Sequence, residues 1–96
     1  MHGEYKMPGG KLVVVDLEVR AGRLAQVQLS GDFFLEPDSA LDAINAALEG
    51  QCADSDEAAL AATVQAATGS QVMMYGVSPG AIAIAVRRAL HEGADA

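Results

Sequence analysis

Cysteine, histidine and basic residues are scarce in this 96-residue chain. The single cysteine, Cys52, excludes an internal disulfide, so we expect the fold to depend on its hydrophobic core and the protein to reside in a reducing cytoplasm. The two histidines, His2 and His91, lie at opposite ends without metal-ligand spacing, and no histidine lies near the cysteine in sequence. We therefore predict no catalytic residue and no metal site.

Long apolar runs are missing as well. The apolar stretch 81–86 is far shorter than the roughly 18 residues that span a bilayer, and the first residues lack the order of a signal peptide, which is basic and then apolar. The net charge is −7, from six basic and 13 acidic residues, which argues against general binding to nucleic acid or to an anionic membrane. We expect a soluble protein that forms one domain over residues 1–96.

The charges are unevenly distributed along the chain. All six cations lie before residue 24 or after residue 86, whereas residues 32–57 carry only acidic charges. The simplest interpretation of this acidic stretch is a set of solvated helical faces that favour solubility. A surface for a basic partner is the alternative.

Two alternating stretches predict a β-hairpin. Apolar residues occupy every second position over residues 12–20 and again over residues 24–30, a pattern typical of half-buried strands. In the second strand, Ala25, Val27 and Leu29 share one face and Leu24 falls on the other. The turn is Ala21-Gly22, and residues 4–7 are expected to add an N-terminal strand or edge segment.

Beyond Pro37 the apolar period changes from two residues to nearly four, which predicts helices. The first has Asp38 or Ser39 as its cap and Gly50 as its left-handed end. The second is rich in alanine, begins near residues 54–55 and runs towards Gly69.

A third helix begins at Ser78-Pro79, where serine suits the cap and proline the first turn, and ends at Gly93. Between the last two helices, residues 71–77 form either a short strand or an ordered loop. The predicted fold class is α+β, with a small antiparallel sheet (the hairpin plus the N-terminal strand) covered on one face by about three helices.

A lysine-flanked loop is the first candidate site. Lys6 and Lys11 bracket Pro8, Gly9 and Gly10 in an otherwise acidic protein. Glycines allow the backbone to approach a ligand or another chain closely, and the two ammonium groups suit a phosphate or carboxylate. The alternative is a simple turn between strands, and the loop lacks the residue spacing of a phosphate-binding P-loop.

The second candidate site is Gly31-Asp32-Phe33-Phe34, at the end of the hairpin. In an extended segment Phe33 and Phe34 point to opposite faces, which leaves one ring for a partner; if the chain bends at Gly31, both rings pack internally. Asp32 either orients a lysine of the first loop or is a solvated turn residue. For the nearby pair Met73-Met74, beside Tyr75, we favour core filling over an interface.

Taken in order, Lys6-Met7-Pro8-Gly9-Gly10-Lys11, the alternating strand and Gly31-Asp32-Phe33-Phe34 resemble the accessory domain of lipoate-protein ligases. Gly76-Val77-Ser78-Pro79 is also similar to the family's C-terminal segment. The resemblance therefore covers most of the chain, although the helices in between match only in pattern.

The resemblance implies a non-catalytic small domain that assists a large catalytic one. The large domain holds lipoate and ATP with Mg, forms lipoyl-adenylate and transfers the lipoyl group to a lysine of an acceptor protein. Since these 96 residues contain no catalytic domain, we expect a separate subunit with no cofactor of its own. Its expected partners are the catalytic large subunit and, indirectly, the lipoyl-acceptor protein.

Two other functions stay open at this point. The lysine-flanked loop suits a stand-alone module that binds a small anion or nucleotide, and the small sheet-and-helix layout also resembles sulfur-transfer or iron-sulfur scaffold proteins, for which Cys52 is the only thiol. Related ligase scaffolds handle biotin and octanoate, so the acyl substrate is open too.

Overall fold

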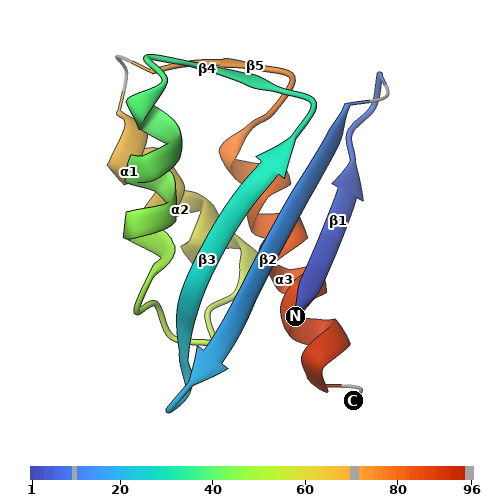
Figure 1. Ribbon diagram of the computed structural model, residues 1–96, viewed down its shortest axis with the longest axis vertical. Coiled ribbons are helices and arrows are strands. Elements are labelled where there is room, and N and C mark those ends of the chain that lie inside the picture. The colour runs from blue at the N-terminus through green and yellow to red at the C-terminus, as the bar shows by residue number, and fades with distance from the viewer. Residues whose placement is uncertain (10, 70–71, 95–96) are drawn as a thin grey trace.

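The computed structural model describes residues 1–9, 11–69 and 72–94. It contains small antiparallel sheets and helices, which confirms the α+β class (Figure 1). The elements in chain order are β1 (His2–Lys6), β2 (Leu12–Arg20), β3 (Arg23–Gly31), β4 (Phe34–Glu36), α1 (Ser39–Leu48), α2 (Glu57–Thr68), β5 (Met73–Tyr75) and α3 (Pro79–Ala94).

The main sheet has the order β1-β2-β3 and is antiparallel throughout. The alternation in β2 is confirmed, because Val13, Val15 and Leu17 are buried between the sheet and the helices. The N-terminal strand is confirmed as well, and it pairs with β2 over its whole length, from His2 opposite Asp16 to Lys6 opposite Leu12.

The hairpin turn and a bulge set the register of β3. Ala21 and Gly22 both have positive φ, at 54° and 75°, which is the backbone of the tight turn that suits the twist of a hairpin. Farther along, Gln26 has φ 51° and the register shifts by one residue, so that two residues of β3 face Leu17 alone. The prediction for Leu24 was therefore wrong: it is 2% exposed and lies in the core with Val27.

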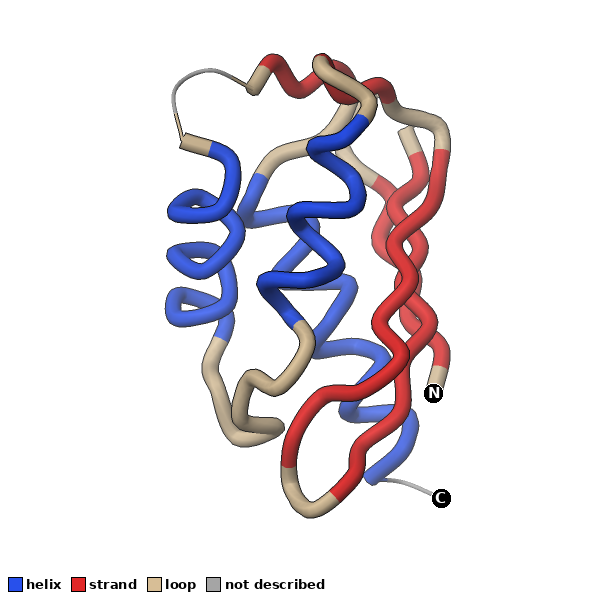
Figure 2. Tube along the Cα trace, turned by 60° about the vertical axis from the view of Figure 1, so that its left-hand side comes forward, coloured by secondary structure: helices blue, strands red, loops and turns tan. Residues whose placement is uncertain are grey.

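The helices lie on one side of the main sheet (Figure 2). Helix α3 contacts β1 and β2, and α1 contacts β3, while α2 packs against α1 and α3. The predicted helical cover is therefore confirmed, with α1 and α3 in contact with the sheet. Among the described residues, no helix is both long and apolar enough to cross a membrane.

The helix ends differ in detail from the sequence predictions. In α3 the Ser78 hydroxyl accepts a hydrogen bond from the Ala81 amide at 3.1 Å, as expected of a cap. In α2 the cap is Asp56, which accepts from the Ala59 amide at 2.8 Å, so this helix begins later than predicted. Asp38 occupies the cap position of α1 but accepts no capping bond, and α3 continues past Gly93 to Ala94.

Beyond the main sheet, β4 and β5 form a two-stranded antiparallel ribbon across one end of the molecule (Figure 1). Phe34 pairs with Tyr75, Leu35 with Met74, and Glu36 with Met73. Within residues 71–77, which the sequence left as strand or loop, residue 71 lies outside the described residues and residues 73–75 form a strand. Its partner lies about 40 residues earlier in the chain, and the loop between β1 and β2 lies at the same end of the molecule.

Candidate functional site

The two sequence motifs meet at the end of the molecule that carries the ribbon. A hollow of about 450 Å³ is lined by Gly9, Lys11, Gly31, Asp32, Phe33 and Phe34. Two backbone hydrogen bonds help to shape it: the Met7 amide donates to the Lys11 carbonyl at 2.7 Å, and the Asp32 amide donates to the Leu12 carbonyl at 3.0 Å. Residues some twenty positions apart in sequence thus share one surface site, which we call the lysine hollow.

The lysine-flanked loop joins β1 to β2. Lys6 ends β1, Pro8 and Gly9 form a turn, and Lys11 precedes β2, whereas Gly10 lies outside the described residues. Gly9 has φ 98°, and a Cβ placed there would meet nothing within 4 Å. This glycine is therefore required by the backbone conformation, while the space beside it is open to another molecule.

The segment after β5 forms the neighbouring wall of the site. Gly76 has φ 80°, and a Cβ placed there would lie 3.1 Å from Cγ of Lys11 and 3.4 Å from the carbonyl oxygen of Asp32. The aliphatic stem of Lys11 thus lies against the segment that leads into α3. All three motifs that carry the family resemblance come together here.

Lys11 and Asp32 line the hollow, whereas Lys6, at the end of β1, is not among its lining residues, and all three residues are exposed. Within the described part of the chain, Lys6, Lys11 and Asp32 form no ion pair and no side-chain hydrogen bond with one another. The hypothesis that Asp32 orients a lysine is therefore wrong for this structure. Lys6 and Lys11 are both exposed residues, so a phosphate or carboxylate can reach them.

The two phenylalanines point in opposite directions. Phe33 is half-buried and packs against the core, whereas Phe34 is 76% exposed to solvent. The interpretation in which both rings pack internally was wrong, because β4 begins at Phe34 and its alternation buries Leu35 and leaves Phe34 on the exposed face. Phe34 also borders a second hollow of about 240 Å³, lined by Phe33, Leu35, Asp38 and Leu41.

The ribbon brings further apolar side chains to the surface beside Phe34. Tyr75, its partner across the strands, is 47% exposed and Met73 is 52% exposed, whereas Met74 packs against the core. Core filling was therefore the right expectation for Met74 and the wrong one for Met73. The alternation of a strand over residues 73–75 was the signal for this difference.

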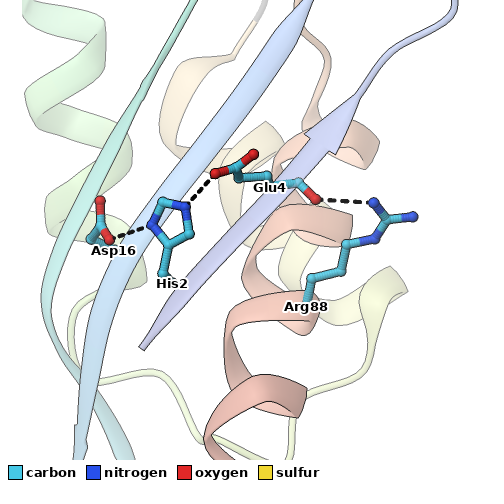
Figure 3. Close-up of polar contacts among 4 residues, drawn as sticks. All are labelled: His2, Glu4, Asp16 and Arg88. Atoms are coloured by element: carbon cyan, nitrogen blue, oxygen red, sulfur yellow. Dashed lines mark hydrogen bonds and ion pairs between the residues drawn. The ribbon is translucent and has the colours of Figure 1, made fainter.

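A separate polar cluster lies on the outer face of the main sheet, at the end of β1 remote from Lys6 (Figure 3). The His2 imidazole contacts Asp16 through Nδ1 at 2.7 Å and Glu4 through Nε2 at 2.5 Å. These hydrogen bonds, that to Glu4 first, raise the pKa of His2 from 6.5 to about 9. Sequence reasoning missed this cluster because it depends on the pairing of His2 with Asp16.

Arg88 of α3 contacts the backbone of β1. Its guanidinium donates to the Glu4 carbonyl at 3.0 Å (Figure 3). The same guanidinium lies 5.1 Å from the ring centroid of Tyr5. This contact ties the last helix to β1.

Cys52 is exposed between α1 and α2, with a free thiol. No group of three or more histidine, cysteine or acidic side chains in the described residues is arranged to hold a metal ion. Within the described structure, Cys52 is therefore not part of such a metal-binding group. The lysine hollow remains the candidate site.

Comparison with known proteins gives one relationship, at the level of the fold. No protein-family model and no curated protein matches the chain. The structure is similar to a chain from the structural analysis of an archaeal lipoylation system, a bi-partite lipoate protein ligase and its E2 lipoyl domain from Thermoplasma acidophilum. The TM-score is 0.69 and the identity 23%, over 91% of this chain and 98% of that chain. The two chains are thus nearly equal in length and share their fold, in agreement with the resemblance drawn from the motifs.

Proposed function

We propose that this chain is the non-catalytic accessory component of a two-part lipoate protein ligase, in which it assists the ATP-dependent activation of lipoate by a separate catalytic chain. The observation that carries the proposal is the lysine hollow, because Lys11 of the first motif and Gly31 to Phe34 of the second line the same surface. The fold shared with a chain of a bi-partite ligase system supports it.

Activation of lipoate brings two anions together. A carboxylate oxygen attacks the α-phosphorus of ATP, the bond from that phosphorus to the oxygen of the β-phosphate breaks, and pyrophosphate leaves. Negative charge accumulates on the α-phosphate oxygens in the transition state, where cationic donors in a site shielded from water are most effective. In this proposal the catalytic chain holds ATP, Mg and lipoate, and Lys6 and Lys11 approach the phosphates as the accessory chain closes over them.

The proposal is tested by measuring pyrophosphate release from ATP and lipoate by the catalytic chain from the same source. Purified accessory chain is added at several molar ratios, and we expect saturable stimulation whose end point gives the stoichiometry. Absence of stimulation by a folded chain that does bind the catalytic chain would contradict the accessory role.

The role of the lysines is tested with the double variant Lys6→Ala/Lys11→Ala at saturating concentration. A charge-assisted hydrogen bond contributes about 1.5–3 kcal/mol, so we expect the stimulated rate to fall at least roughly tenfold. Arg20→Gln/Arg23→Gln makes the same change in net charge at the far end of the hairpin and should leave stimulation intact. Unchanged adenylation by the lysine variant would leave the loop as a structural turn.

Direct anion binding is the second candidate function, favoured by the exposed Lys11 at the open hollow. Isothermal titration of the chain alone with ATP and then with lipoate distinguishes the two functions. The accessory role predicts no saturable binding without the catalytic chain, whereas a stand-alone module binds one of the two ligands.

A Cys52→Ala variant should support adenylation fully; its failure would favour the sulfur-transfer alternative.

A further inference from the structure

Exposed apolar side chains are concentrated on the β4–β5 ribbon. Among the described residues, four large hydrophobic side chains are exposed, and three of them lie here: Phe34 at 76%, Met73 at 52% and Tyr75 at 47%. The pairing of Phe34 with Tyr75 places two aromatic residues directly opposite one another. We call these three residues the ribbon face. Contiguous aromatic and methionine surface of this kind marks sites of protein contact.

Acidic side chains border the ribbon face. Glu36 lies opposite Met73 on the neighbouring strand, and Asp38 lines the second hollow beside Phe34. Both residues are exposed, and within the described residues neither carboxylate takes part in an ion pair. On the other side of Phe34, the lysine hollow contributes Asp32 together with Lys11. The border thus carries three carboxylates and one ammonium group.

We infer that the ribbon face docks onto the catalytic chain, on an apolar recess with a basic border. This inference rests on the proposed function, since it names the surface through which the accessory chain meets its partner. Charge complementarity predicts that the border of the catalytic chain's recess is basic. The acidic border of the ribbon face, in an already acidic chain, attracts a basic surface and repels another copy of this chain. Phe34, the most exposed ring, is the anchor.

The location of the ribbon face explains how docking and assistance combine. Phe34 belongs to the ribbon face and also lines the lysine hollow, so a partner that receives its ring comes to lie next to Lys11. The ribbon face then provides the affinity for the catalytic chain, and the lysines act on the reaction.

The test measures the Kd for the catalytic chain by titration calorimetry, together with adenylation at rising accessory concentration. We expect Phe34→Ser to weaken binding roughly thirtyfold, as loss of an interface anchor does. Tyr75→Ser is the second variant, and circular dichroism and thermal melting verify that both remain folded. A wild-type Kd for both folded variants would overturn the inference.

Charge is tested with a matched pair of double variants. Glu36→Gln/Asp38→Asn should bind more weakly and with a smaller dependence on salt, because fewer charges meet the basic border. Asp54→Asn/Glu57→Gln removes the same charge near the start of α2 and should bind like the wild type. Equal effects of the two pairs would show that only net charge matters, which would overturn the basic border.

The outcomes also separate this inference from the proposed function. A wild-type chain that binds without stimulating adenylation, but loses affinity with Phe34→Ser, retains the docking surface and refutes the accessory role. A wild-type chain that does not bind the catalytic chain refutes both.

Discussion

Gly3 is the residue whose replacement best tests how α3 is held against the sheet. It is buried in β1, and a Cβ placed there would lie 2.2 Å from the carbonyl oxygen of Ala85 and 2.4 Å from the amide nitrogen of Ala89. Both obstacles are helix backbone, so no side-chain rotation relieves the clash. Ordinary contact begins near 3.4 Å, and Gly3→Ala must therefore separate helix and strand by roughly 1 Å.

The separation loosens the packing of α3 against the main sheet. Overpacking a core costs about 1–3 kcal/mol, and we expect the upper end of that range because the backbone itself must move. For a domain of this size, about 3 kcal/mol lowers the Tm by roughly 10–20 °C. Gly76 lies three residues before the start of α3 and leaves no free space for a Cβ beside Lys11, so we also expect weaker stimulation of adenylation by this variant.

Thermal unfolding followed by circular dichroism measures the effect, with Gly80→Ala as the matched control. Gly80 lies in the first turn of α3, and the nearest atom to a Cβ placed there is the Ser78 hydroxyl at 3.9 Å. The same substitution should there stabilise the protein by about 0.5 kcal/mol, because alanine reduces the entropy of the unfolded chain. Equal melting temperatures for Gly3→Ala and the wild type would refute the close packing of α3 on β1.

Two other regions give predictions about stability. The pKa of His2 is raised from 6.5 to about 9, so its contacts with Glu4 and Asp16 contribute stability that is fully present below about pH 6.5 and lost as the pH rises through about 9. Denaturant unfolding across this range should show that decline in the wild type and its reduction in His2→Gln, and an NMR titration of His2 with a midpoint near 6.5 would contradict the contacts. At the β3 bulge, the Glu49 carboxylate accepts hydrogen bonds from the amides of Gln26 at 3.0 Å and Val27 at 2.5 Å. Glu49→Gln leaves one of these amides without an acceptor and should cost about 1–2 kcal/mol with faster hydrogen exchange at Val27, whereas the exposed Glu57→Gln should change stability by less than about 0.5 kcal/mol.

The sequence correctly predicted those parts of the fold that depend only on residues close together in the chain. Alternation over residues 12–20 predicted β2 with its buried face, and Ala21-Gly22 predicted the turn, because side-chain direction and turn conformation are local properties. The cap at Ser78 was predicted for the same reason. The order of the motifs also indicated a resemblance to lipoate-protein ligase accessory domains, and the shared fold agrees with it.

Only the tertiary structure decided which distant segments meet. The bulge that returns Leu24 to the core is held by Glu49 from beyond the end of α1, and no pattern within the strand itself indicates it. Strand β5 becomes a strand by pairing with β4, and that pairing alone turns Phe34 and Tyr75 outward together. The physical reason is that each contact is formed by groups far apart in sequence. A strand pattern specifies which side chains alternate, while the partner strand and the covering helix determine which face is buried and which remains open for another protein.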